Sequence, residues 1–307
     1  MIIKFSDKIY ERWYSILRNN RKQLAFFIVW AVFIYYLEHV LRWDWISLPM
    51  TPVALLGGGL AIFLGFRNNS AYDRWWEARK IWGGMVNVSR TFSMNVISFL
   101  KSENEEDRIH QIVKRHLAFI YALKNQLREL EALHQSKDFL RSDELLIHEN
   151  KVNAATSILT EQGMSITTLK KEGKIDAFEH QLLMKNIELM FDYQGMSERI
   201  KKTVFPYFYK YFTRTFLWLF LLILPASLVH EMSWHAIPLS VAISFVYMIL
   251  DRIGDVTENP LDGRSSGTPL NAICRTIEID LLQQLGEENI PESYPVKETR
   301  HKSKFID

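Results

Sequence analysis

The chain has 307 residues, a formal net charge of +2 and 48% apolar residues. So small a charge, without any basic run, argues against a nucleic-acid-binding protein. The single cysteine, Cys274, excludes an intrachain disulfide framework and a cysteine-rich metal site. The apolar residues are gathered in blocks, which predicts an all-α membrane protein.

Four apolar blocks predict four transmembrane helices. The first, residues 24–41, follows a charged amphipathic N-terminal segment and would span about 27 Å of a hydrocarbon core of about 30 Å. The others are residues 52–66, 216–229 and 234–250. Because no small-residue cleavage site follows the first block, we expect a retained membrane helix and not a signal peptide. Core helices of a soluble protein are the alternative for blocks this short.

Basic residues mark one side of the predicted membrane. Lysines and arginines precede the first and third blocks and follow the second and fourth, whereas the two remaining connections hold one arginine, Arg42. Under the positive-inside rule, both termini and the long middle segment are cytoplasmic. The sequence therefore predicts a multi-pass protein whose surroundings are a lipid bilayer.

The regions between and after the blocks have the apolar periodicity of helices. We expect one integrated fold of four parts: residues 1–66 (N-terminal amphipathic helix and two transmembrane helices), 67–212 (cytoplasmic helices), 213–252 (two transmembrane helices) and 253–307 (cytoplasmic loop, helix and tail). Three apolar stripes recur at three- and four-residue spacing. They are Ile112, His116, Phe119, Ile120, Leu123, Leu127 and Leu130; Ile175, Phe178, Leu182, Leu189 and Tyr193; and Leu270, Ile273, Ile277 and Leu281.

Enzyme motifs are missing from the sequence. The nearest approach to a metal-binding H-E-x-x-H motif, His230 and His235, has the wrong spacing. The glycine triplet 57–59 lacks the pattern of a phosphate-binding loop, and there is no nucleophile elbow. Glu38 and His39 are adjacent polar residues in the first block, but they point about 100° apart on a helix. The sequence predicts no enzyme and no cofactor.

The second block contains three consecutive glycines, which are unfavourable inside a helix and need a reason. One reason is close contact between helices, because small residues let backbones approach in membranes. The other is that this helix lines a narrow central conduit. Gly58, Ile62 and Phe66 are four residues apart and share one face, with steps of about 6 Å. Around a symmetry axis, Ile62 and Phe66 would form apolar rings, which can gate ion flow by dewetting.

A polar segment follows this block and has two readings. Arg67, Asn68, Asn69 and Arg74 would either orient the cytoplasmic end of the conduit and meet permeating ions, or make polar contacts between helices. The nearby tryptophans 75, 76 and 82 are interpreted as packing residues.

At this point the sequence resembles the bacterial branch of the bestrophin family. The segment FLGFRNNSAYDRWWEARKIWG, which begins at Phe63, is similar to the family signature. GMSERI (195–200) followed by Pro206, ENPLDG (258–263) and TPLNAICRTIEIDLL (268–282) extend the likeness over nearly the whole chain.

The resemblance implies a homopentamer in the bacterial inner membrane, with one pore on the five-fold axis. Carried over by position, the neck would be formed by Gly58, Ile62 and Phe66, and position 58 departs from the bulky aliphatic residue usual there. The cytosolic aperture would be Phe178, with Ile175 as the alternative register.

The resemblance also concerns calcium. Animal members carry a calcium clasp after an Asn-Pro pair. Here Asn259 is present, but residues 264–267 (RSSG) replace the acidic run, so the sequence gives no support for calcium activation.

The resulting hypothesis is passive conduction of small monovalent ions through the hydrophobic neck and the aperture. Animal relatives resemble chloride channels and the bacterial branch includes cation-conducting members; the hypothesis favours cations and leaves anions open. The alternative is a membrane-anchored helical sensor or scaffold without a pore.

Overall fold

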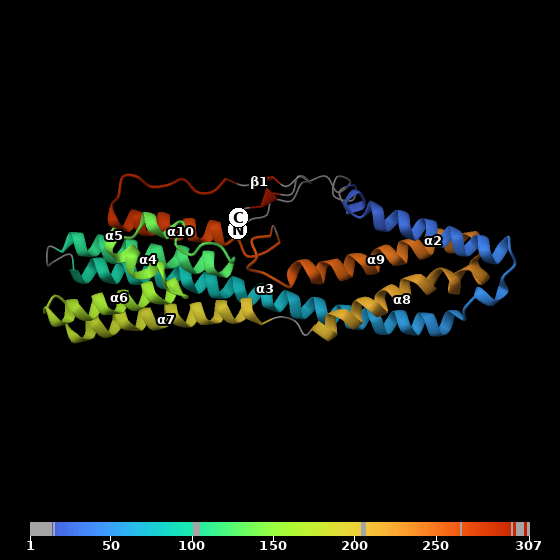
Figure 1. Ribbon diagram of the computed structural model, residues 1–307, viewed down its shortest axis with the longest axis horizontal. Helices are drawn as coiled ribbons and strands as arrows, with labels where there is room; N and C mark the ends of the chain where they lie inside the picture. The colour runs from blue at the N-terminus through green and yellow to red at the C-terminus, as the bar shows by residue number, and fades with distance from the viewer. Residues whose placement is uncertain are drawn as a thin grey trace. The chain divides into compact units, whose positions relative to one another are not determined.

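The computed structural model describes residues 14, 16–100, 105–203, 207–264, 266–295, 297–298 and 304–305. Most of the predicted amphipathic N-terminal segment, Pro206 and Ser265 lie outside the described residues. The described chain is almost entirely helical, which confirms the predicted all-α class; β1 (Lys297–Glu298) and β2 (Lys304–Phe305) have two residues each (Figure 1). The chain divides into two compact units, residues 1–74, 204–259 and 298–304, and residues 75–203, 260–297 and 305–307.

The first unit is a bundle built from the apolar blocks. It contains α2 (Arg21–His39), the beginning of α3 (Met50–Leu100), α8 (Tyr207–Met232) and α9 (Ala236–Thr257), with the short turns η1 (Asp44–Ile46) and η4 (Ser233–His235). Helices α2, α8 and α9 pack on one another. Trp30 of α2 donates its indole N–H to the Leu222 carbonyl of α8 at 2.9 Å.

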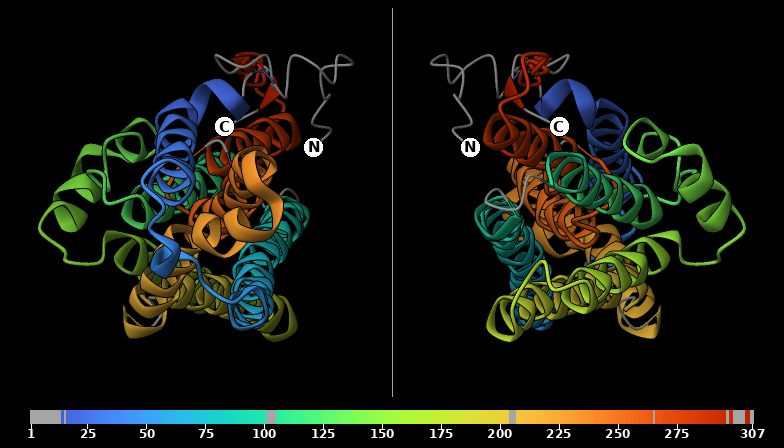
Figure 2. Two further views of the ribbon diagram at one scale, coloured as in Figure 1. Left: turned by 90° about the vertical axis from the view of Figure 1, so that its right-hand side faces the viewer. Right: turned by 90° about the vertical axis from the view of Figure 1, so that its left-hand side faces the viewer.

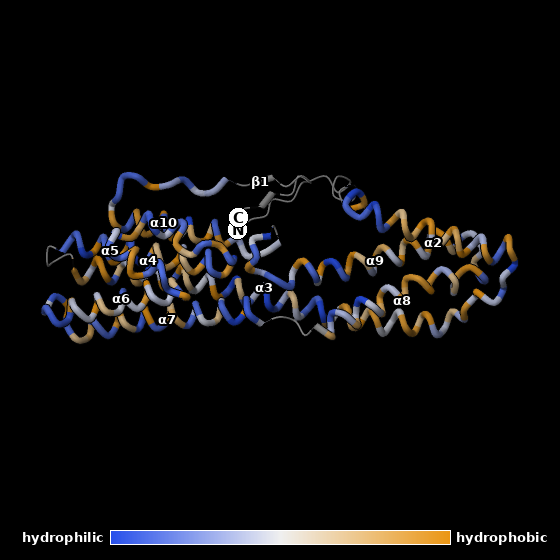
Figure 3. The backbone as a smooth tube through the Cα atoms, in the orientation of Figure 1, coloured by the Kyte–Doolittle hydropathy of each residue, from blue (hydrophilic) through white to orange (hydrophobic). Residues whose placement is uncertain are grey.

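Apolar residues dominate the helices of this unit, as the colours of Figure 3 show for α2, α8 and α9. In the described part of the chain, two stretches are long and apolar enough to cross a membrane, residues 44–100 and 208–257. The second stretch includes both α8 and α9, separated by η4. The predicted blocks 216–229 and 234–250 therefore fall within one apolar helical hairpin.

The second unit packs around one central helix. It holds the rest of α3, α4 (Glu106–Leu127), α5 (Ser142–Glu149), α6 (Ala154–Lys171), α7 (Ala177–Lys202) and α10 (Leu270–Leu285), with the turn η3 (Ser136–Asp138). Helix α4 packs against α6, α7 and α10 (Figure 2). Residues 117–123 of α4 are all buried, which is expected of a helix surrounded by others.

The three predicted apolar stripes match the core of this unit to different degrees: one is buried throughout, one has a single exposed member, and one is buried only in part. Six members of the first stripe are buried, but Leu130 is 58% exposed because α4 ends at Leu127 and the chain turns at Glu129, whose φ is 58°. The α10 stripe is buried throughout. In the second stripe Ile175 is buried, whereas Phe178 and Leu182 are exposed.

Candidate functional site

One face of α3 carries large apolar side chains that nothing in the first unit covers. Ile62 and Phe66 are 61% and 64% exposed, and a Cβ added at Gly58 would have no atom within 4 Å. Leu60 and Leu64, on the other side of the helix, are 6% and 0% exposed. The three predicted neck residues therefore share a free face of α3, and the helix packs into its own bundle through the opposite face.

The glycine triplet has two different environments. A Cβ at Gly57 would lie 2.8 Å from the ring of Phe220, so only glycine lets α3 approach α8 this closely. The Gly57 carbonyl also accepts a hydrogen bond of 2.9 Å from the Tyr247 hydroxyl of α9. Gly58 and Gly59 have open space beside them. Close helix contact thus accounts for the first glycine and not for the other two.

The residue after Phe66 anchors α3 in a cluster of ion pairs. Arg67 is 2% exposed and donates to Asp251 and to Asp255 of α9, each at 2.5 Å. On α8, Arg214 pairs with Asp255, and Lys210 lies 2.8 Å from Glu258, which closes the C-terminal end of α9. We call Arg67, Lys210, Arg214, Asp251, Asp255 and Glu258 the charge cluster. Three cations meet three carboxylates, so the cluster is balanced, as burial of charge requires.

The other predicted polar residues are distributed around α3. The Asn68 side chain donates to the Leu250 carbonyl at 3.0 Å, and a Cβ at Gly254 would lie 2.5 Å from its Oδ1 atom. Asn69 is exposed, and Arg74 is half-buried and engaged in a contact. Arg67 and Asn68 therefore make contacts between helices. Asn69 remains on the exposed side.

Sequence reasoning missed the acidic half of this cluster. Asp251, Asp255 and Glu258 are spaced by four and three residues, so they share one face of a helix. That spacing was the available signal. Their partner Arg67 lies far away in the chain, 184 residues from Asp251. No local sequence pattern could connect residues so far apart.

The two flanks of the exposed α3 face are unlike. One flank carries only small exposed residues, Ala54, Ala61 and Gly65. The other flank borders an apolar groove of about 540 Å³ between α3 and α8. The groove is lined by Leu55, Leu56, Gly59, Leu60, Phe63, Phe208, Tyr209, Phe212, Thr213 and Phe216.

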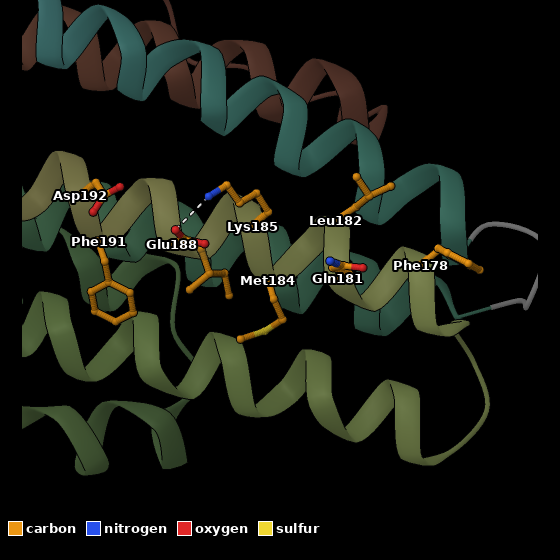
Figure 4. Close-up of a pocket in the computed structure, with 9 residues that line it drawn as sticks. Phe178, Gln181, Leu182, Met184, Lys185, Glu188, Phe191 and Asp192 are labelled. Carbon is orange, nitrogen blue, oxygen red and sulfur yellow. Dashed lines mark hydrogen bonds and ion pairs between the residues drawn. The ribbon is translucent and has the colours of Figure 1, made fainter.

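The two aperture candidates have opposite environments. Phe178 is 78% exposed in the first turn of α7, where Asp176 caps the helix by accepting hydrogen bonds from the amides of Phe178 and Glu179. It stands at one end of a groove of about 760 Å³ along α7 that also holds Leu182 and Phe191 (Figure 4). Ile175 is 4% exposed and belongs to the core of the second unit. Only Phe178 therefore presents its side chain at a surface.

The end of the bundle at η4 holds the polar residues considered for chemistry. Glu38 is 5% exposed, and its Oε1 atom lies 3.1 Å from Nδ1 of His230; His39 contacts the Ser233 hydroxyl at 3.1 Å. Within the described ranges, no group of three or more His, Cys, Asp or Glu residues is arranged to hold a metal ion. These contacts join α2 to the turn between α8 and α9.

Comparison with known proteins gives consistent matches over most of the chain. A family model described as bacterial and fungal bestrophin protein matches residues 10–283. A voltage-dependent anion channel-forming protein of Mesorhizobium japonicum is 29% identical over 274 residues, which are 89% of this chain and 87% of that protein. The voltage-dependent anion channel-forming protein YneE of Salmonella typhi is 31% identical over 246 residues, 80% of each chain.

A solved structure has the same fold. The crystal structure of a bacterial bestrophin homologue from Klebsiella pneumoniae superposes with a TM-score of 0.83 at 28% sequence identity. The match covers 87% of this chain and 98% of that one. The similarity thus includes both the apolar helices and the second unit.

Proposed function

Because this chain belongs to the bacterial and fungal bestrophin family, a family of membrane channel proteins, we propose that it is the pore-forming subunit of a homopentameric channel for small monovalent ions. The observation that carries the proposal is the free face of α3. Ile62 and Phe66 are more than half exposed there, while the opposite face of the helix is buried. Five copies around an axis would bring these side chains together as two apolar rings, which hold back water and ions unless the neck opens.

The unlike flanks of α3 support a ring assembly. A two-fold interface buries the same surface on both partners, whereas a head-to-tail interface joins two different surfaces and forms a ring when the rotation between copies closes. The small-residue flank of one copy (Ala54, Ala61, Gly65) is suited to close approach in a membrane. The groove beside Phe63 and Phe216 offers bulky apolar side chains to a neighbour. Ile62 and Phe66 lie between the two flanks and would face the axis.

The membrane arrangement proposed here keeps four crossings, by α2, the beginning of α3, α8 and α9. The basic residues at their ends favour cytoplasmic termini and a cytoplasmic second unit. The bacterial inner membrane is the proposed location.

In the second unit, Phe178 is the proposed aperture residue. Its exposure in the first turn of α7 allows five copies to approach one another. Ile175 is enclosed in the core and would reach a pore only after the second unit rearranged.

Whether the permeant ion is a cation or an anion is a separate part of the proposal. The resemblance to the bacterial branch of the family favours cations. The two relatives compared above are anion channel-forming proteins, which supports anion conduction as the second candidate. Reversal potentials of the purified protein in a planar bilayer with asymmetric KCl separate the two, because each ion drives the zero-current voltage in a different direction.

The same recording tests the pore itself. Ile62→Ala and Phe66→Ala remove the apolar rings, and we expect a larger conductance or a higher open probability. Phe33→Ala is the matched control, because Phe33 is a 46% exposed phenylalanine on α2. Absence of current from the wild type and from both α3 variants would contradict the channel.

The alternative is a membrane-anchored sensor or scaffold without a pore. Its partner site would be the apolar groove along α7, which is exposed in the isolated chain. Mass photometry of the detergent-solubilised protein distinguishes the two hypotheses. Five copies support the channel, and a monomer or dimer supports the scaffold.

A further inference from the structure

After Phe66, the next charged residue on the free face of α3 is Asp73. At about 100° per residue, Asp73 lies about 20° from Ile62 and about 20° from Phe66, in a direction between them. It follows Phe66 by about 10 Å along the helix. Asp73 is exposed, and so is Asn69, which lies one helical turn nearer to Phe66. Asp73 is thus the first charged residue that follows Phe66 on the face of the apolar neck residues.

The other charged groups of this part of α3 point elsewhere. Residues 50–74 contain three charged residues, Arg67, Asp73 and Arg74. Arg67 lies about 140° from Ile62, and its guanidinium is paired in the charge cluster. Arg74 lies about 120° from Ile62, is half-buried and has a contact of its own.

The third charged residue is Asp73. Its side chain makes no hydrogen bond or ion pair with any residue that the structure describes. Arg67 is therefore neutralised by carboxylates of α9, whereas Asp73 on the free face has no such counter-charge in the described chain.

We propose that Asp73, repeated around the axis of the pentamer, forms a ring of carboxylates that favours cations over anions at the cytoplasmic end of the neck. The inference rests on the proposed channel function and names the specificity-determining residue for it. Acidic rings select cations by concentrating them locally and repelling anions, and the effect is strong where low-dielectric walls focus the field. The apolar rings of Ile62 and Phe66 have no charge and cannot provide this discrimination.

The test is the cation-to-anion permeability ratio of the full-length protein in a planar bilayer with asymmetric KCl. We expect Asp73→Asn to lower this ratio roughly tenfold, the lower end of the range for charge-focused clefts, and Asp73→Glu to keep it. The direction of the change is expected whichever ion the wild type prefers. Asp143→Asn is the matched control, because Asp143 is an exposed aspartate on α5 without an ion pair in the described chain, and its ratio should equal that of the wild type.

A cysteine variant tests the same position within one folded protein, so the result does not depend on how well Asp73→Asn folds. In Asp73→Cys, a negatively charged methanethiosulfonate reagent should raise the ratio and a positively charged one should lower it in the same membrane. The native Cys274 is fully buried and burial raises the pKa of its thiol to about 12, so the introduced thiol is the reactive one. Currents whose ratio is unchanged by both reagents and by Asp73→Asn overturn the inference and leave the channel standing. No current in the wild type overturns the channel itself.

Discussion

The guanidinium of Arg67 lies 2.5 Å from the carboxylate of Asp251, and this contact joins α3 to α9 one residue beyond Phe66. A buried arginine fixes the rotation of the helix that carries it, because its donors must keep their acceptors. Arg67 lies about 100° around the helix from Phe66. Holding Arg67 against α9 therefore turns Phe66 away from the bundle, and the charge cluster orients the proposed neck.

We expect Arg67→Met to destabilise the protein strongly. The change keeps the length of the side chain but leaves Asp251 and Asp255 with one cation fewer, and breaking a buried ion pair costs about 3–5 kcal/mol. The melting temperature of the detergent-solubilised protein measures the loss. Arg199→Met is the control, because Arg199 pairs with Glu77 at the surface, where such pairs contribute about 1 kcal/mol or less.

A double variant tests whether the loss arises from the pair. Asp251→Asn alone should also destabilise, and Arg67→Met with Asp251→Asn should lose less than the sum of the two single changes, because the second removes a charge that the first left unpaired. Additive losses would show that the two residues act independently.

The approach of α9 to Asn68 predicts a second sensitive position. A Cβ at Gly254 would lie 2.5 Å from Oδ1 of Asn68 and 3.4 Å from Nε of Arg67, so Gly254→Ala should lower the melting temperature. Adding Asn68→Ala should recover part of the loss. Gly163→Ala in α6 meets only ordinary contacts of 3.7 and 3.8 Å and should be neutral or stabilising by up to about 1 kcal/mol. Equal effects at both glycines would contradict the close approach.

The sequence contained the elements of this site but not its pairings. The apolar block before Arg67 predicts the helix, and four-residue spacing predicts the shared face of Ile62 and Phe66. The positive-inside rule explains only on which side of the membrane Lys210 and Arg214 lie. It does not predict that both residues take part in the charge cluster. Contacts between α3, α8 and α9 depend on tertiary packing, which one-dimensional spacing does not contain.

Periodicity also fails where a helix ends. The spacing that predicts a buried Leu123 and Leu127 includes Leu130, yet α4 stops at Leu127 and Leu130 is exposed. In the second stripe, Phe178 is apolar and exposed because α7 presents it at the surface and not to the core. A sequence pattern shows which residues are apolar, and the fold decides which of them face a neighbour.

The opposite burial of the two aperture candidates gives a separate prediction. Ile175→Ala removes a core side chain and should cost about 2–5 kcal/mol of stability. Phe178→Ala should leave the melting temperature nearly unchanged and alter single-channel conductance. A stability loss at Phe178 as large as that at Ile175 would contradict an exposed aperture residue.

Thiol accessibility tests the orientation of α3 without relying on current. In liposomes, Phe66→Cys should react with a membrane-impermeant thiol reagent when the channel is open, and Leu64→Cys should not, since Leu64 is fully buried against the bundle. Adding Arg67→Met to each variant should reduce the difference between the two rates. Equal reactivity of the two cysteines without that change would contradict the orientation.

The second unit offers a pH-dependent prediction through His116. This residue of α4 is fully buried between Phe92 and Phe119, and burial lowers the pKa of its imidazole to about 3. The Ser89 hydroxyl donates to the Met85 carbonyl at 2.7 Å, so Nε2 of His116 donates to Ser89 at 2.9 Å and Nδ1 has no proton. The folded protein therefore keeps this histidine neutral, whereas the unfolded chain protonates it below a pH of about 6.5.

A histidine with a lowered pKa stabilises the fold above the pKa of the unfolded state, and this contribution is lost as the pH falls from about 6.5 towards 3. The slope approaches 1.4 kcal/mol per pH unit for one proton. His116→Phe has no such proton, and Ser89 retains its bond to Met85 in that variant. We expect the melting temperature of the wild type to fall more steeply than that of His116→Phe between pH 7 and 4. Parallel curves would mean that His116 takes up its proton equally well in the folded protein, and so that the core around it admits water.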